Sequence, residues 1–484
     1  MADRWERDSL GTLKVPADAY YGIFTQRAKG NFHLSGQRVP LPLIHTLVLI
    51  KKAAANVNMQ LGLLDKKLGA AIVAASSDVL KDKNPEPFPM DIFQAGAGTP
   101  MNMNVNEVLA NLATEKLGGK KGEYLVHPNN HVNMAQSSND VVPTAIRLAV
   151  ALQTPALLVE LIQLAEIFER KAKQYENVVK VGRTHLQDAV PIRYGQVFRA
   201  YANAMRKAVA KIEHAERCLY AISIGGTAVG TGLNAHPKYR KMMLEELKKA
   251  TKLPLEPCAD MVVDSWSMTC FVEYSNALRM LALDLGKLCD DLRLLASGPY
   301  AGVNEISLPE VEPGSSIMPG KINPSIPEAV NMVCYQIVGN DAAVCAAANA
   351  SQLELGVMTP VIAHNLLSSA ELLTNAVQTL REKCVVGMTV NKERCQELLM
   401  KSPIIATALN QYLGYEVVAE LVKMSLRDNR PIKDLIVLKG LVSKNDLAAL
   451  LDPRYLTGPS VVDQKLVKKI QNGEAYKRFR NSLR

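Results

Sequence analysis

The sequence predicts a mainly α-helical protein whose centre is a bundle of long helices. Ala, Leu and Val dominate the composition, and aromatic residues make up only 5% of the 484 residues. Ala and Leu are good helix formers, whereas aromatic and β-branched residues favour strands. Apolar residues also recur at steps of three and four over much of the chain between about 143 and 393, which is typical of amphipathic helices.

Five long segments carry this periodicity. They are residues 143–174, 195–219, 270–296, 327–349 and 361–384. Helices of this length would each span roughly 30–50 Å, and long antiparallel helices with apolar stripes form bundles. Several of these segments have more apolar surface than one bundle interior can bury. We therefore expect helices to pack against one another between subunits as well.

The chain is expected to divide into three parts around this bundle. Residues 1–140 form a mixed, mostly helical N-terminal domain, residues 141–395 the central long-helix bundle, and residues 396–484 a small C-terminal helical domain. Within the first part, short helices are predicted at 41–61, 64–80 and 106–117. In the last part, frequent Pro and Gly residues break the pattern into shorter elements.

Composition argues against several classes of protein. The net charge is +9, but Lys and Arg are spread along the chain among 47 Asp and Glu residues, so no nucleic-acid interface is expected. A mild positive field can still attract a dicarboxylate. No run of 18 uncharged apolar residues and no secretory signal are visible, so we expect a cytoplasmic protein without a membrane span.

Cysteines and glycines give no sign of a cofactor. None of the eight cysteines forms a CxxC pair, and reduced core thiols explain them better than disulfides or a zinc site. No dinucleotide fingerprint and no metal-ligand cluster is visible in the sequence, and we expect no required cofactor and no metal.

Four polar segments interrupt the helical pattern, each at or near the end of an expected helix. They are residues 94–99, 136–140, 182–188 and 314–323. Their hydroxyl and amide side chains can cap helices, and exposed backbone N–H groups at helix ends can hold carboxylate oxygens. Segment 136–140, taken alone, is better explained as a cap and turn. Four such segments in one chain, two of them with a cation or a histidine, predict a composite anion site.

The segment 314–323, Gly-Ser-Ser-Ile-Met-Pro-Gly-Lys-Ile-Asn, is the most informative of the four. Lys321 and Asn323 are suitable partners for one carboxylate of a dicarboxylate ligand. A serine beside a glycine on a mobile loop also suits a lid. The alternative is a flexible surface turn with an incidental lysine.

His185 allows two interpretations as well. A lone histidine between Thr184 and Leu186 is often a structural residue. Glu328, however, opens the helix expected after Asn323, and its carboxylate can orient and charge His185 if the two elements meet.

The run from Gly314 to Pro324 resembles the signature of the aspartase/fumarase superfamily. Further segments that resemble fumarase or aspartase are residues 15–22, 102–107, 225–234 and 304–309, so the resemblance extends over nearly the whole chain. It implies a three-domain, mostly α-helical subunit. It also implies a homotetramer with a twenty-helix core, in which each active site is drawn from three chains.

The resemblance also implies a role for each candidate residue. Ser315 would be the base that removes a proton from the carbon next to a substrate carboxylate. The resulting aci-carboxylate dianion would be held by Lys321, Asn323, Ser316, Ser137 and Ser138. The other carboxylate and the leaving group would be held by Thr99, Asn139, Thr184 and His185, with Glu328 paired to His185. Donors aimed at developing charge are usually the largest catalytic term.

The branch of the superfamily is less clear, because the sequence mixes two sets of marks. Tyr20-Tyr21-Gly22, Ala97 and residues 324–328 are similar to aspartase, whereas residues 126–129 and Ser137-Ser138-Asn139 are similar to class II fumarase. Fumarases usually carry a serine where Ala97 stands, and that hydroxyl would help to hold a water molecule. The expected reaction is therefore elimination of ammonia from L-aspartate to give fumarate, as in the aspartate ammonia-lyase branch.

Three alternatives stay open. The first is a class II fumarase acting on L-malate, and the others are a lyase for a related fumarate–amine adduct and a non-catalytic tetramer on the same scaffold. Pro100, Asn130 and Tyr300 depart from both branches, and Pro100, next to Thr99, bears most on the identity of the substrate.

Overall fold

The computed structural model describes residues 2–483 and is mainly α-helical, which confirms the predicted fold class. The helices are α1 (Ile23–Asn31), α2 (Leu41–Gln60), α3 (Lys66–Lys81), α4 (Thr99–Lys116), α5 (Ser138–Gln174), α6 (Tyr194–Glu216), α7 (Tyr239–Thr251), α8 (Met261–Trp266), α9 (Thr269–Leu295), α10 (Ser325–Asn349), α11 (Thr359–Leu380), α12 (Lys392–Lys401), α13 (Asn410–Leu413), α14 (Tyr415–Asp428), α15 (Ile432–Leu438), α16 (Lys444–Leu450), α17 (Pro453–Leu456), α18 (Gln464–Asn472) and α19 (Glu474–Asn481).

Short strands and short π- and 3₁₀ helices complete the described part of the chain. Four strand pairs are present in the described residues: β1 (Asp3–Asp8) with β2 (Gly11–Pro16), β3 (Val179–Thr184) with β4 (Gln187–Arg193), β5 (Ala221–Ile222) with β6 (Glu256–Pro257), and β7 (Ile306–Ser307) with β8 (Thr389–Val390). The π-helices are η1 (Pro128–Val132) and η3 (Arg381–Val385), and the 3₁₀ helices are η2 (Arg217–Leu219) and η4 (Pro403–Leu409).

The five long predicted helices are all present as α5, α6, α9, α10 and α11. The starts of α5 and α4, however, lie earlier in the chain than predicted. Helix α5 begins at Ser138, about a turn before the predicted start at 143, because the Asp140 carboxylate accepts a hydrogen bond from the Ser137 amide at 3.0 Å. Helix α4 begins at Thr99 rather than at 106. Pro100 fits there, since the first turn of a helix needs no backbone N–H donor.

The chain divides into two compact units. The first consists of Met1–Glu160, Ala208–Leu285 and Met332–Ala376, and the second of Leu161–Lys207, Gly286–Asn331 and Val377–Arg484. Each of the five long helices contributes a segment to both units. The division of the chain into domains at 140 and 395 stays a prediction.

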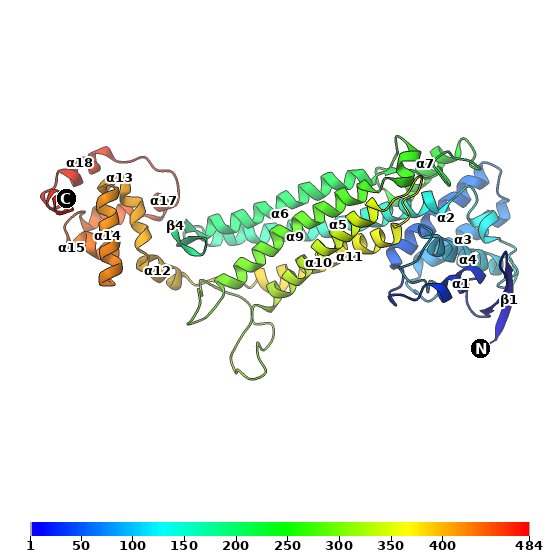
Figure 1. The fold of residues 1–484 in the computed structure, drawn as a ribbon, viewed down its shortest axis with the longest axis horizontal. Coiled ribbons are helices and arrows are strands. Elements are labelled where there is room, and N and C mark those ends of the chain that lie inside the picture. Colours follow the sequence, from blue (N-terminus) through cyan, green and yellow to red (C-terminus); the bar gives the residue numbers. More distant parts are fainter. Residues whose placement is uncertain (1, 484) are drawn as a thin grey trace. The chain divides into compact units, whose positions relative to one another are not determined.

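Polar contacts join the long helices within the first unit. The Thr154 hydroxyl on α5 lies 2.7 Å from the Tyr274 hydroxyl on α9, and Ser275 on α9 donates to Asp341 on α10 at 2.7 Å. The Asn340 amide on α10 donates to Ser369 on α11 at 3.0 Å. These segments therefore lie side by side around a largely apolar interior (Figure 1).

Helix α5 is long and apolar enough to cross a membrane by length and composition alone. The same criterion is met by buried core helices. In this helix the Arg147 side chain is buried and forms an ion pair with Asp264 at 3.4 Å, with the ring of Phe271 beneath its guanidinium. We therefore assign the apolar character of α5 to packing within the bundle.

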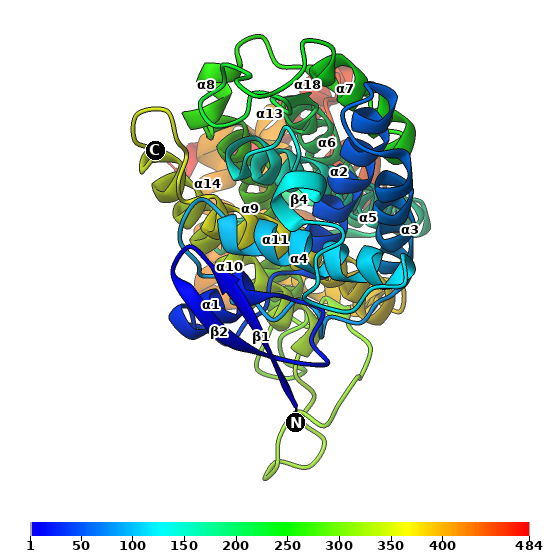
Figure 2. The same cartoon turned by 90° about the vertical axis from the view of Figure 1, so that its right-hand side faces the viewer.

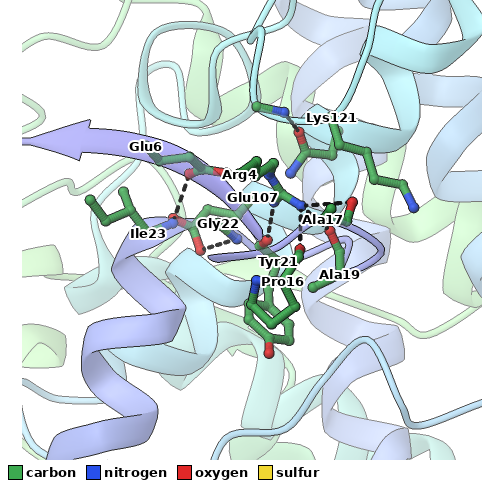
Figure 3. A network of polar contacts seen from close by, with 12 residues as sticks. Arg4, Glu6, Pro16, Ala17, Ala19, Tyr21, Gly22, Ile23, Glu107 and Lys121 are labelled. Atoms are coloured by element: carbon green, nitrogen blue, oxygen red, sulfur yellow. Dashed lines mark hydrogen bonds and ion pairs between the residues drawn. The ribbon is translucent and has the colours of Figure 1, made fainter. Parts of the chain in front are cut away.

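A polar network fixes the N-terminal hairpin to α1 and α4 in the first unit. Figure 2 shows β1 and β2 side by side next to α1. Arg4 donates to the carbonyl oxygens of Pro16 and Tyr21 at 2.8 and 2.7 Å, and Figure 3 shows these contacts as dashed lines. Glu107 on α4 accepts from the amides of Gly22, Phe24 and Thr25 at 2.8–3.0 Å. These three amides include the N-terminal N–H groups of α1, which lack partners within that helix.

The second unit contains the β3–β4 hairpin and the C-terminal helices α12–α19. Figure 1 shows these helices gathered in one group, coloured orange to red. Their core is apolar and includes Leu409, Leu413, Leu421, Leu435 and Leu450. Burial of such side chains stabilises this group by roughly 1.5–3 kcal/mol for each one.

Asp91 anchors the chain just before α4. Its carboxylate accepts from the amides of Leu34, Ser35 and Gly36 at 2.7–3.0 Å and from the Ser35 hydroxyl at 2.8 Å. Burial opposes ionisation, but these hydrogen bonds prevail and lower the pKa of Asp91 to about 2. The Asp91 backbone carbonyl accepts from Gln94, so this turn also positions the start of α4.

The Asp91 turn predicts a pH-dependent loss of stability. A carboxylate whose pKa is lower in the folded state stabilises above its unfolded pKa of about 3.9, and that contribution disappears as the pH falls toward 2. Asp91→Asn should therefore lower the free energy of unfolding by about 2 kcal/mol at neutral pH and by much less near pH 2–3. Urea unfolding at both pH values measures the difference.

The control for this prediction is Asp3→Asn, since the exposed Asp3 carboxylate lies 4.0 Å from Lys14. It should change stability by less than about 0.5 kcal/mol at either pH. A pH-independent effect of Asp91→Asn would contradict the assignment of the stabilisation to the charged carboxylate.

Candidate active site

The N-termini of two helices meet in the first unit. The Thr99 hydroxyl at the start of α4 lies 3.0 Å from the Ser138 hydroxyl at the start of α5, within hydrogen-bond distance. The helices approach closely because Gly98 has no side chain: a Cβ there would lie only 3.0 Å from Val142 of α5. Each helix N-terminus carries partial positive charge and unpaired N–H groups, so two together form a natural site for an anion.

The loop before α4 is strained. Gly96, Ala97 and Gly98 all have positive φ angles, of 75°, 52° and 82°. Alanine in this left-handed conformation costs roughly 1–2 kcal/mol, which neighbouring structure must offset. Ala97 is buried, and the loop is closed by the Thr99 hydroxyl donating to the Gly96 carbonyl at 2.7 Å.

The turn before α5 brings together three more predicted site residues. Ser137, Ser138 and Asn139 are half-buried, so a ligand can reach them. The Ser137 hydroxyl accepts from the Asn139 amide at 3.2 Å, and the Asn139 side chain donates to the Ala228 carbonyl at 2.7 Å. Thr99 and these three residues, from two segments distant in sequence, therefore lie close together.

Two supporting residues of this site, Asn102 and Lys51, were not predicted. Asn102 is buried and donates to the Ser138 hydroxyl at 3.2 Å. Lys51 is fully buried and donates to the side-chain oxygens of Asn133 and Gln136 at 2.8 and 2.9 Å. The signal for Lys51 was its position among apolar residues on the core face of a predicted helix, where a lysine needs buried partners.

Thr184 and His185 lie at the tip of the β3–β4 hairpin in the second unit. His185 and Leu186 form the two-residue loop, and both have positive φ angles, of 54° and 62°. Such loops prefer Asn-Gly or similar pairs, so a leucine there is strained. Thr184, His185 and Leu186 are exposed, which leaves the tip free to contact a ligand or another chain.

A buried carboxylate anchors the base of this hairpin. Glu305 has no exposed surface and accepts from Arg183 at 2.7 Å and from the Tyr194 hydroxyl at 3.0 Å, while Lys180 lies 3.1 Å away. Burial lowers the pKa of Lys180, and attraction by Glu305 opposes that shift. The two cations and the hydroxyl together compensate the buried charge of Glu305.

The loop 314–323 places the Ser315 hydroxyl close to two backbone amides. The hydroxyl oxygen accepts from the amides of Ile317 and Met318, both at 3.2 Å. Two N–H donors aimed at one oxygen stabilise negative charge on that oxygen. The two ends of the loop approach closely at Gly314, where a Cβ would lie only 2.5 Å from the Lys321 carbonyl oxygen.

Of the other candidate residues in the loop, one bonds to the opposite end of the loop and two have exposed side chains. The Asn323 amide donates to the Gly314 carbonyl at 2.7 Å, so this group holds the two ends of the loop together. Ser316 and Lys321 are exposed, and across residues 2–483 Lys321 forms no ion pair. The Lys321 ammonium is therefore free to bind an anionic ligand.

Glu328 lies in the first turn of α10, half-buried. Within the described part of the chain, no hydrogen bond or ion pair joins it to His185, so their predicted pairing stays a prediction. Nor do the described His, Cys, Asp and Glu side chains form a group of three that could hold a metal ion.

Comparison with known proteins places the chain in a family. A family model described as lyase matches residues 11–339, and one described as the fumarase C C-terminus matches residues 405–458. The chain therefore belongs to the lyase family.

Individual relatives extend this likeness over nearly the whole chain. An aspartate ammonia-lyase of Pseudomonas canavaninivorans is 46% identical, covering 96% of this chain and 98% of its own. Among solved structures, fumarate lyase:delta crystallin from Brucella melitensis bound to cobalt is similar with a TM-score of 0.92 and 44% identity. Class II fumarase from Schistosoma mansoni is similar with a TM-score of 0.90 and 36% identity. Each match covers 95% of this chain and 100% of that structure.

The buried Glu305 predicts a large effect of a small change. Glu305→Gln keeps the shape but leaves Lys180 and Arg183 without their counter-charge, and breaking a buried pair in this way costs about 3–5 kcal/mol. Denaturant unfolding should show a loss of that size. The exposed Glu310→Gln is the matched control and should be near neutral, and equal stability of both variants would contradict the anchoring role.

Proposed function

We propose that the protein catalyses reversible elimination of ammonia from L-aspartate to give fumarate. The observation that carries this proposal is the Ser315 hydroxyl with two backbone N–H donors at 3.2 Å, in a loop beside a free lysine. A relative named aspartate ammonia-lyase, 46% identical over 96% of this chain, supports the choice of leaving group. Ala97 supports it too, because its methyl group cannot hold a water molecule by hydrogen bonding.

Ser315 is the proposed base. A serine hydroxyl is a weak base unless its oxyanion is stabilised, and the amides of Ile317 and Met318 supply that stabilisation. Once the Ser315 hydroxyl has lost its own proton to solvent, the alkoxide takes the proton from the carbon next to one carboxylate, and the electron pair moves into that carboxylate. The aci-carboxylate then collapses, the carbon–nitrogen bond breaks, and neutral ammonia leaves. The proton taken by Ser315 passes on to solvent.

The remaining candidate residues bind charge. Lys321, Asn323 and Ser316 on the loop, with Ser137 and Ser138 at the start of α5, would hold the aci-carboxylate. Thr99, Asn139, Thr184 and His185 would hold the other carboxylate and the leaving group, with Glu328 orienting His185. The paired N-termini of α4 and α5 favour a ligand with negative charge at this end.

A homotetramer with sites drawn from three chains completes this proposal. Within the first unit, α10 exposes Met332, Tyr335 and Val338 at three-residue steps, and α5 exposes Leu152 and Val159. Apolar surface of this kind on a long helix is typical of an interface. In such a tetramer, Ser138 and Ser315 of one site would come from different chains. We expect this assembly in the cytoplasm.

Class II fumarase is the second candidate, because the S. mansoni enzyme has a TM-score of 0.90 to this chain. The two candidates separate in one experiment. Purified protein is given L-aspartate or L-malate side by side, and fumarate absorbance and ammonia are measured. Fumarate with equimolar ammonia from aspartate is expected, whereas fumarate from malate alone would favour the fumarase. Turnover of neither would leave an amine-adduct lyase or a non-catalytic tetramer.

Ser315→Ala tests the assignment of the base. It should lower kcat at least about 10³-fold, since the group that removes the proton is lost, while the protein remains folded by circular dichroism. The exposed Ser482→Ala serves as a control and should turn over at the wild-type rate. A Ser315→Ala variant with near-normal kcat would remove Ser315 from the base role.

A further inference from the structure

Lys51 on α2 is a lysine with no access to solvent. Its side chain is 0% exposed, and burial lowers its pKa to about 7, against the attraction of the Asp140 carboxylate. Its ammonium donates to the side-chain oxygens of Asn133 and Gln136 at 2.8 and 2.9 Å and forms no ion pair in the described chain. A buried cation is costly, so a lysine here indicates a role that an apolar residue cannot fill.

Both acceptors of Lys51 lie in one turn. The Gln136 side chain also donates to the Val132 carbonyl at 3.0 Å, and the Asn133 side chain donates to the Gln136 carbonyl at 3.2 Å. Ala135 between them has a φ of 61°, a strained conformation that the surrounding bonds must maintain. Lys51 is therefore at the centre of a closed network that fixes residues 132–136.

This turn leads directly into the proposed substrate-binding residues. Asn133 accepts from Asn102 at 3.4 Å, and Asn102 donates to the Ser138 hydroxyl at 3.2 Å. On the far side, Asp140 accepts from the amides of Ser137, Gly225 and Thr227 at 2.9–3.0 Å. Burial raises the pKa of Asp140 to about 6, while those amides and Lys51 favour its charged form.

The geometry points to Lys51 as a positioning residue that holds the turn 132–136 in place, and through it the Ser137 and Ser138 donors. The inference rests on the proposed function, because Ser137 and Ser138 matter only if they bind the dicarboxylate. Lys51 itself does not touch the substrate. Its contribution is to fix donors that would otherwise have to be ordered each time a ligand binds.

Lys51→Met tests this inference in the full-length protein. Methionine keeps the approximate length of the side chain but removes the donor, so Ser137 and Ser138 are held less firmly. They should then bind the substrate carboxylate and the aci-carboxylate less well. KM for L-aspartate and the inhibition constant of succinate, a dicarboxylate without a leaving group, should each rise about tenfold. Loss of folded protein alone would lower the maximal rate but leave both constants unchanged.

Lys52→Met is the matched control, since Lys52 is the next residue on α2, half-buried, and has no hydrogen bond or ion pair in the described residues. It should keep both constants at wild-type values. Wild-type constants in folded Lys51→Met would overturn the inference. If Lys51→Met gives no folded protein, Asn133→Ala leaves Lys51 in place and removes one of its two acceptors, together with the Asn133 bonds to Gln136 and Asn102. A threefold or larger rise in both constants then supports the inference, and unchanged constants overturn it.

The two hypotheses fail in different ways. A wild-type protein that does not act on L-aspartate overturns the proposed function, and with it the basis of the inference. A wild-type protein that does act on it, together with an unaltered Lys51→Met variant, overturns the positioning role alone.

Discussion

The hydroxyl contact between Thr99 and Ser138 is the interaction on which the candidate site depends. It joins the first residues of α4 and α5, so the positive ends of an 18-residue and a 37-residue helix face the same place. A dicarboxylate carries two fixed charges, and helix N-termini satisfy such charge without placing another buried ion there. The glycine at 98 and the strained Ala97 are consequences of bringing these two ends so close.

In each unit a buried charge supports a segment that carries candidate site residues. In the first unit Lys51 secures the turn before α5, and in the second Glu305 secures the hairpin that carries Thr184 and His185. Buried charges are costly in free energy but leave few alternative arrangements for the groups bonded to them. The two buried charges are opposite in sign, and each holds a backbone segment that carries proposed ligand-binding side chains.

Much of this architecture could be predicted from the sequence. The long helices followed from apolar periodicity, and the four polar segments followed from small hydroxyl and amide residues at helix ends. The start of α4 was wrong by seven residues because the polar Asn102 and Asn104 hid its first two turns, although both are buried. The role of Lys51 could not be predicted, since its partners depend on how a distant turn packs against α2. The pair of amides at Ser315 depends likewise on a loop conformation that spacing does not specify.

The central claim is that Ser138 and Ser315 of one active site come from different chains. Mixing Ser138→Ala and Ser315→Ala subunits tests it most directly, after dissociation and reassociation at equal amounts, with each variant alone inactive. If the two serines of a site belong to different chains, random assembly leaves roughly a quarter of the sites with both, and about that share of wild-type turnover should return. If both serines belong to one chain, no site regains them, and an inactive mixture of fully reassembled tetramers would contradict the claim.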